Sequence, residues 1–153
     1  MKISARDVAV SLSLFAIAAM TTFCAIPASA QDKSLKEALV GHWQLVSVSV
    51  NGRTPYGADP HGSMFMDAAG HFSVIVVSDG NARSLAYFGT YTVNDADKSV
   101  VIHIEDSAGG GTPNAAGREL KRLVTLSGNQ LTVQNELATG ATGGVQVTWK
   151  RAN

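Results

Sequence analysis

The feature of this chain that most constrains its fold is a two-residue hydrophobic alternation that begins near Trp43 and continues almost to the C-terminus. An alternation of this period is typical of strands that bury one face, and the turn residues between the runs mark where strands end. The predicted strands are 43–50, 63–67, 72–78, 86–94, 99–105, 119–127, 130–137 and 145–151. Since no segment between them is long enough for a crossover helix, we expect neighbouring strands to pair antiparallel.

The connections between these predicted strands alternate strictly in length. NGRTPYGADPHG, DGNARSL, DSAGGGTPNAAGR and ATGATGG are long, whereas AAG, DADK and GN are short. Alternate connections of an antiparallel meander lie at opposite ends, so one end would be sealed by tight turns and the other would carry every long loop. A sandwich without a cavity, whose loops merely vary in length, is the alternative. We expect the cup, an all-β eight-stranded antiparallel up-and-down barrel.

A short helix is expected before the first strand, and a buried tryptophan is expected at the sealed end. Ser34 and Glu37 have the spacing of a capping box, which predicts a helix over 34–40. In a closed barrel the last strand pairs with the first, so Trp43 would lie beside Arg151. We expect Trp43 to be buried there, with the guanidinium of Arg151 across its indole in a cation–π contact. This role is structural rather than catalytic.

Residues 1–30 have the pattern of a secretory signal. Lys2 and Arg6 form a positive start, residues 8–26 are apolar, and Ala28-Ser29-Ala30 matches the small-residue pattern that signal peptidase cuts. The apolar run is too interrupted to be a convincing membrane span. We expect cleavage after residue 30, which leaves residues 31–153 as one exported domain, periplasmic or secreted.

Cys24 raises the alternative of a lipoprotein anchor, but Thr21-Thr22-Phe23 before it does not match a lipobox, and we expect no stable membrane anchor. No cysteine remains after cleavage, so the domain would rely on its apolar core and its sheet.

The charge balance argues against several classes of partner. Of 12 basic and 12 acidic residues, the signal removes Lys2, Arg6 and Asp7, which leaves a net charge of −1. This near-neutrality argues against nucleic acid and anionic membrane surfaces as partners. We expect a monomer or a weak homodimer.

The motif Gly41-x-Trp43, together with Arg151 at the end of the last strand, resembles the lipocalin and calycin signature. A closer resemblance is to the bacterial and fungal lipocalin-like domain family. Its features run in order from Leu39 to Arg151 as LVGHWQLVSVSV, PYGADPHGSMFMDAAGHFSV, FGTYTV, IHI and KRLVTLSGNQLTV, and the chain departs from them in the glycine-rich SAGGGTPNAAG. The resemblance implies an eight-stranded calyx that holds a small apolar molecule, but no defined activity, because much of that family has none assigned.

Side-chain alternation predicts which polar residues face the interior. Arg122 alternates in phase with Leu120 and Val124, so it is expected on the inner face of its strand. Across the NDADK hairpin we expect Tyr91 near Val101 and Gly89 near His103, because cross-strand partners face the same side.

On this register Tyr87, Tyr91, His103 and Arg122 would converge inside the barrel. A ligand carboxylate could then be held by the guanidinium of Arg122 with a tyrosine hydroxyl beside it.

Several alternatives stay open at this point. Arg122 could pair with Glu105 or Glu136 instead, or point outward if the register is wrong by one residue. His103 could be a general base or a ligand contact, but a hydrogen-bonded wall residue is the simpler interpretation. Met64 and Met66 are expected to line the core or the cavity.

No motif for metal, cofactor or nucleophilic catalysis stands out. The histidines lack H-x-H and H-E-x-x-H spacing, G-x-S-x-G is absent, and Gly109–Gly111 lacks the Lys-Ser/Thr of a phosphate loop. We therefore expect no metal, no cofactor and no catalytic residue.

The sequence favours an exported protein that binds a small hydrophobic or amphipathic molecule. The alternatives are a small calyx enzyme of lyase, isomerase or hydrolase type that uses His103, Tyr91 and Arg122, and a plugged barrel that binds proteins or inhibits them through its outer surface.

Overall fold

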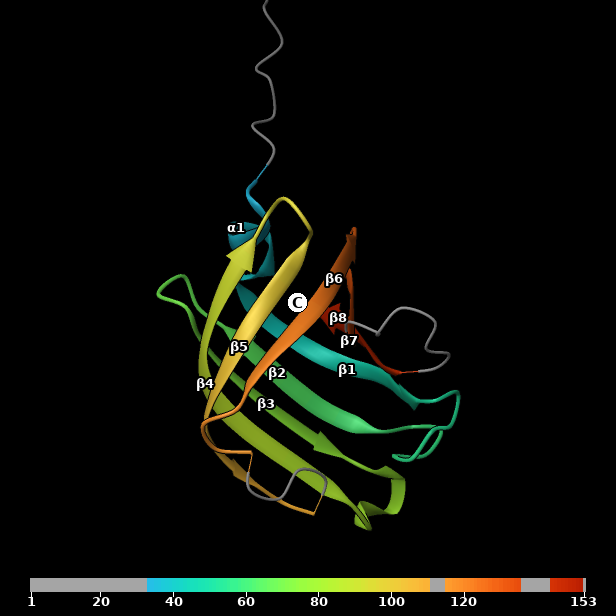
Figure 1. Cartoon of the computed structure of the whole chain (residues 1–153). Coiled ribbons are helices and arrows are strands. Elements are labelled where there is room, and N and C mark those ends of the chain that lie inside the picture. Colours follow the sequence, from blue (N-terminus) through green and yellow to red (C-terminus); the bar gives the residue numbers. More distant parts are fainter. Residues whose placement is uncertain (1–32, 111–114, 136–143, 153) are drawn as a thin grey trace, which may run out of the picture. The chain divides into compact units, whose positions relative to one another are not determined.

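The computed structural model describes residues 33–110, 115–135 and 144–152, which form a closed antiparallel barrel of eight strands (Figure 1). The elements in chain order are α1 (Leu35–Leu39), β1 (Gly41–Val50), β2 (His61–Met66), β3 (His71–Val77), the 3-10 turn η1 (Asp79–Asn81), β4 (Ser84–Asn94), β5 (Ser99–Ala108), β6 (Glu119–Ser127), β7 (Gln130–Asn135) and β8 (Val145–Arg151). Each strand pairs with the next, and β8 pairs with β1, so the predicted up-and-down barrel with one short helix is confirmed. The expected signal segment, 1–30, lies outside the described residues.

The connections separate to two ends of the barrel, as their lengths predict. Residues 51–60 and 78–83 join strands at one end, called the long-loop end below. Residues 67–70, 95–98 and 128–129 join strands at the other, the tight-turn end, where α1 also lies (Figure 1). Any opening into the barrel is therefore expected at the long-loop end, since α1 covers the other.

Helix α1 is capped as the sequence predicts. The side chain of Ser34 accepts a hydrogen bond from the Glu37 amide, and the Glu37 carboxylate accepts one from the Ser34 amide at 3.0 Å, which completes the capping box. Leu35 and Leu39 are buried, and the Leu35 amide donates to Asp95 Oδ1 across 2.9 Å. These contacts attach the helix to the barrel through the β4–β5 turn.

The tight-turn end is filled by Trp43. Its ring is fully buried, its Nε1 donates to the Leu39 carbonyl at 2.9 Å, and the guanidinium carbon of Arg151 lies 4.1 Å from its centroid. The expected contact between the first and last strands is therefore present. Gly41 makes room for it, because a Cβ at this position would lie 2.8 Å from Arg151 Nη1 and its φ of +136° disfavours any side chain.

The strands alternate between the barrel interior and solvent. In β3, for example, Phe72, Val74 and Val76 are buried, whereas Ile75 between them is 53% exposed. Similar inward sets from every strand form one continuous apolar interior. Among the described residues, no helix is long and apolar enough to cross a membrane.

Candidate functional site

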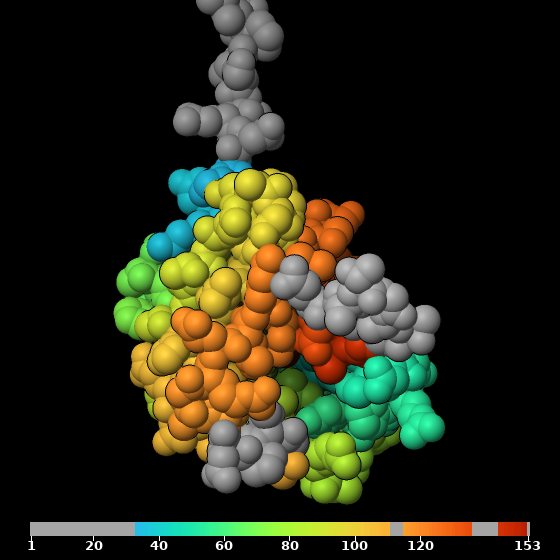
Figure 2. Space-filling view, in the orientation of Figure 1, coloured from blue at the N-terminus to red at the C-terminus, as the bar shows by residue number. Residues whose placement is uncertain are grey.

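A cavity of about 260 Å³ occupies the interior of the barrel. Its volume lies just below the range of about 300–1,000 Å³ typical of small-molecule sites, which points to a small ligand. Most of its wall is aliphatic or aromatic, and side chains from all eight strands contribute. The apolar lining residues are Leu39, Val48, Val50, Met64, Met66, Phe72, Val74, Val76, Leu85, Val100, Ile102, Ile104, Leu120, Val124, Leu131, Val133, Val145, Val147 and Trp149. Figure 2 shows the surface hollowed between β6 in orange and the blue-green residues after β1.

Four polar side chains also line this cavity: Tyr56, Tyr87, Arg122 and Asn135. We call them the polar cluster. Arg122 stands between Leu120 and Val124 on β6, which both line the cavity, so its charge lies between apolar neighbours. Its orientation is therefore the inward one that the alternation of the strand predicts.

The charge of Arg122 has no counter-charge among the described residues. No carboxylate there lies within 4.0 Å of its guanidinium, and its Nη1 donates to the carbonyl of its neighbour Lys121 at 3.1 Å. Burial lowers the pKa of Arg122, and the positive charge of Arg118 lowers it further. An arginine still stays protonated at neutral pH, so a positive charge faces the cavity.

This arrangement decides one of the open alternatives and leaves another. Glu105 is exposed and makes no ion pair with Arg122, so that pairing is absent. The other proposed partner, Glu136, lies outside the described residues.

The two tyrosines of the polar cluster come from different elements. Tyr87 lies on β4, its ring makes an edge contact with Phe72 at 5.7 Å between centroids, and burial raises its pKa while the nearby guanidinium of Arg122 opposes the rise. Tyr56 comes from the loop between β1 and β2, and only 6% of its surface is exposed. The Arg83 guanidinium carbon lies 5.9 Å from the Tyr56 ring centroid. Both phenols are neutral near pH 7, so they can donate and accept hydrogen bonds.

Asn135 is the last residue of β7 and pairs directly with Arg122 on β6. Its Oδ1 is buried and has no hydrogen-bond partner among the described residues. An unsatisfied buried acceptor costs about 1–3 kcal/mol, so this atom favours any molecule that brings a donor to it.

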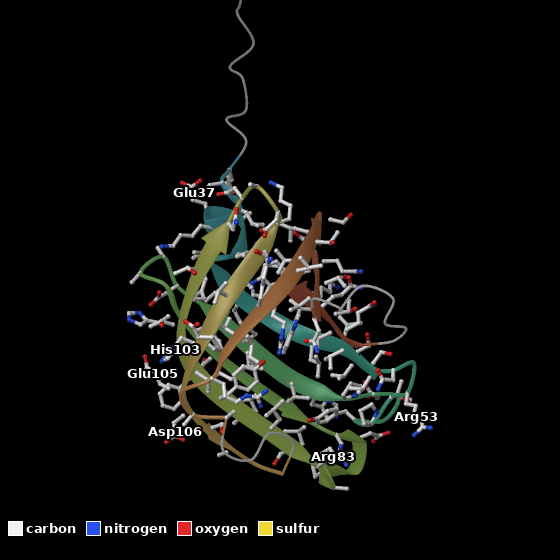
Figure 3. The ribbon with its side chains drawn as sticks, viewed as in Figure 1. Glu37, Arg53, Arg83, His103, Glu105 and Asp106 are labelled. Carbon is white, nitrogen blue, oxygen red and sulfur yellow. The ribbon has the colours of Figure 1, made fainter. Side chains whose placement is uncertain are left out.

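The expected inward position of His103 is wrong. His103 is exposed on the outer face of β5, and with Glu105 and Asp106 it points away from the barrel in Figure 3. His103 pairs with Thr90, whereas Gly89 pairs with Ile104. It therefore cannot act as a base or a ligand contact inside the cavity.

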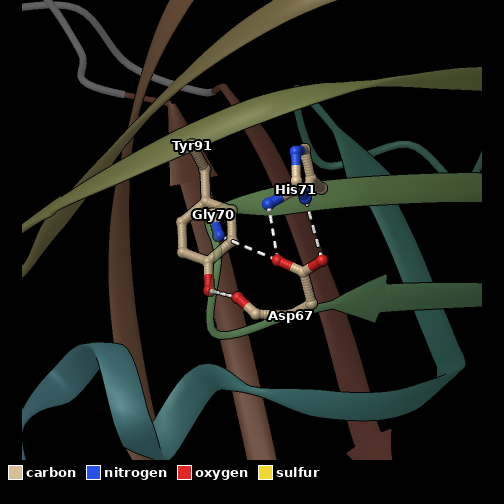
Figure 4. A network of polar contacts seen from close by, with 4 residues as sticks. All are labelled: Asp67, Gly70, His71 and Tyr91. Atoms are coloured by element: carbon tan, nitrogen blue, oxygen red, sulfur yellow. Dashed lines mark hydrogen bonds and ion pairs between the residues drawn. The ribbon is translucent and has the colours of Figure 1, made fainter.

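Tyr91 is buried, but it does not line the cavity. Its hydroxyl donates to the Asp67 carbonyl at 2.6 Å in the tight turn between β2 and β3 (Figure 4). The same turn is held by Asp67 Oδ1, which accepts from the Gly70 and His71 amides, and by the 2.9 Å contact between Asp67 Oδ2 and His71 Nδ1. Tyr91 is thus part of the closed end, and the expected convergence of Tyr91, His103 and Arg122 does not occur.

The error lies in the register of the β4–β5 hairpin. Tyr91 pairs with Ile102 rather than with Val101, although residues 95–98 form the connection as expected, so the expected pairing was one residue away from the one that this turn gives. Lys98 belongs to the turn, with a left-handed φ of +52°. A shift of one residue moves every side chain of a strand to the other face, which is why His103 lies outside.

Other predicted site residues do line the cavity. Met64, Met66 and Tyr87 are in its wall, as is Arg122. Two polar lining residues, Tyr56 and Asn135, were not predicted as site residues, although each left a signal in the sequence. Asn135 alternates in phase with the inward Leu131 and Val133, and Tyr56 is a lone aromatic side chain in a long polar loop.

The outer face carries exposed apolar side chains as well. Phe65 on β2 and Phe88 on β4 are both opposite Ser73 of β3, and each is about half exposed, as are Ile75 and Val46. The ring of His42 stacks on Phe65 at 4.2 Å. The barrel therefore has an exposed apolar surface in addition to an interior cavity.

No group of three or more histidine, cysteine, aspartate or glutamate side chains in the described part of the chain could hold a metal ion. Comparisons with protein-family models and with curated proteins found no match. The geometry of the cavity is therefore the feature that points to a function.

Proposed function

We propose that this protein binds a small amphipathic molecule in the barrel cavity, with an anionic head on Arg122 and an apolar body along the aliphatic wall. One observation carries the proposal: a guanidinium faces an apolar cavity and has no counter-charge among the described residues. Burying an unpaired charge is costly, so a ligand carboxylate that paired with Arg122 would gain a charge-assisted bond in a poorly solvated place. Arg118 adds a second positive charge that acts on Arg122, which also favours an anion.

The test compares two probes that differ in their heads, decanoic acid and decanol. Arg122→Leu should weaken decanoate binding by about 1.5–3 kcal/mol, the contribution of hydrogen bonds to charged groups, and leave decanol binding nearly unchanged. Lys150→Leu is the matched control, because Lys150 is an exposed cation on the last strand. Calorimetric titration of the folded proteins measures both affinities.

Each outcome of this experiment has a different meaning. Equal losses of affinity for decanoate and decanol would mean that Arg122→Leu had damaged the barrel, and circular dichroism would show that damage. An unchanged decanoate affinity would overturn the anion site. Native mass spectrometry of protein taken from its own host would then identify what the cavity carries.

We also propose that the protein is exported and belongs to the lipocalin-like type that its motifs resemble. The support is the signal-like pattern of residues 1–30 and the up-and-down barrel. Intact-mass measurement of protein from the host should give a chain that begins at Gln31, and an acylated Cys24 at the N-terminus would contradict this.

A further inference from the structure

The polar cluster contains one charged donor and one neutral acceptor on adjacent strands. Arg122 and Asn135 are direct cross-strand partners of the β6–β7 pair, and both line the cavity. Side chains at such paired positions start about 4.5–5.5 Å apart at their Cβ atoms and face the same side. A single small head group can therefore reach both side chains.

The acceptor of Asn135 is not used by the protein itself. Its neighbour on β7, the outward Gln134, donates through Nε2 to Gln146 Oε1 at 2.8 Å across the β7–β8 pair. Asn135 Oδ1 has no such partner among the described residues, although it is buried. Arg122 does not supply the donor, because the only hydrogen bond of its guanidinium within the described residues goes to the Lys121 carbonyl.

A simple carboxylate satisfies only half of this arrangement. An ionised carboxylate accepts hydrogen bonds and donates none, so it can pair with Arg122 but not with Asn135 Oδ1. A head group that satisfies both side chains needs an anion and a hydrogen-bond donor close together. One small group of this kind is a carboxylate with a hydroxyl on the first or second carbon next to it.

We propose that the cavity selects hydroxy acids of this kind, with the carboxylate on Arg122 and the hydroxyl donating to Asn135 Oδ1. The inference rests on the proposed binding of an amphipathic anion and adds the chemistry of its head. The aliphatic chain of the ligand lies along the apolar wall on either side of Arg122, formed in part by Leu120 and Val124.

The test uses three acids of the same chain length: decanoic acid, β-hydroxydecanoic acid and ω-hydroxydecanoic acid. The two hydroxy acids have the same composition and differ only in where the hydroxyl lies. We expect wild-type protein to bind the β-hydroxy acid about 3- to 10-fold more tightly than decanoic acid, the range of one net hydrogen bond. The ω-hydroxy acid should have no such advantage, because its hydroxyl lies far from Asn135.

Asn135→Leu should remove the advantage of the β-hydroxy acid, so that this acid and decanoic acid bind the variant with equal affinity. Gln134→Leu is the matched control, because Gln134 is exposed on the same strand and faces away from the cavity. In that control the preference of the wild type should persist.

The failure of this inference and the failure of the proposed function look different. If no acid binds wild-type protein, the proposed function itself is wrong. If decanoic and β-hydroxydecanoic acid bind equally well, only the hydroxy-acid inference is overturned. An equal loss of affinity for both acids in folded Asn135→Leu would also overturn the hydroxy-acid inference, because Asn135 would then contact the carboxylate rather than the hydroxyl.

Discussion

The guanidinium carbon of Arg151 lies 4.1 Å from the ring centroid of Trp43, and the same guanidinium donates to the carbonyls of Ala38 and Val40. These contacts join the last strand, the first strand and the end of α1 at one point. The last carbonyls of a helix have no partner within it. Here Arg151 donates to those of Ala38 and Val40, and Trp43 Nε1 donates to that of Leu39. The pair therefore closes the barrel and its tight-turn end together.

Trp43→Ala should lower the free energy of unfolding by about 3–5 kcal/mol, the usual cost of deleting a buried large aromatic side chain. The variant also loses the cation–π contact with Arg151 and the hydrogen bond from Nε1 to the Leu39 carbonyl. Urea unfolding followed by circular dichroism measures the change. Val46→Ala serves as the control, because Val46 is 47% exposed on the same strand and should change stability by less than about 0.5 kcal/mol. A loss of similar size in both variants would contradict a special role for Trp43.

Local patterns predicted the barrel well, and the reasons can be followed in individual residues. Phe72, Val74 and Val76 are buried and alternate along β3 with less buried neighbours, as in a sheet with one buried face. This alternation can be seen in the sequence without any structure. The Ser34–Glu37 capping box and the pairing of Trp43 with Arg151 also follow from spacing and from closure of the barrel.

Pairing between strands was harder to predict, because it depends on turn conformation. The connection at 95–98 was expected correctly, but it pairs Asn94 with Ser99, which is one residue away from the pairing expected for Tyr91. This difference of one residue in the pairing moved His103 from the expected interior to the surface. Arg122 was placed correctly because its position follows from alternation within one strand, which needs no knowledge of a partner.

The turn between β2 and β3 should make stability depend on pH in the acid range. Hydrogen bonds from the backbone and the side chain of His71 hold the pKa of Asp67 below its ordinary value of 3.8. Because the folded pKa is depressed, the stabilising effect is fully present above the unfolded value and is lost as pH falls through the folded one. Asp67→Asn should therefore be less stable than the wild type near pH 7, and the difference should shrink below about pH 3.8.

Urea midpoints measured between neutral and acid pH check this expectation. Asp59→Asn is the control, because Asp59 is an exposed aspartate in the β1–β2 connection. A stability difference between wild type and Asp67→Asn that grew as the pH fell would contradict a depressed pKa for Asp67 in the folded protein.

Filling the cavity should block binding without changing the charge of the polar cluster. Val133 on β7 lines the cavity and is only partly buried, so a larger side chain there can extend into the open volume. Val133→Phe should reduce the affinity for decanoate and for decanol alike, by at least about tenfold, because the apolar body of both probes needs that space. The added ring replaces cavity volume rather than packed atoms, so stability should change little or rise.

Val46→Phe provides the comparison on the outside of the barrel, since Val46 is exposed and does not line the cavity. It should leave both affinities unchanged. Full binding by folded Val133→Phe would mean that the probes bind elsewhere, and the exposed apolar side chains of Phe65, Ile75 and Phe88 would then be the surface to examine. Two results together would place the apolar body and the anionic head in the same cavity. Val133→Phe would lose affinity for both probes, and Arg122→Leu would lose affinity for decanoate alone. Neither variant alone can place both parts of the ligand, because Val133→Phe removes only space and Arg122→Leu removes only charge.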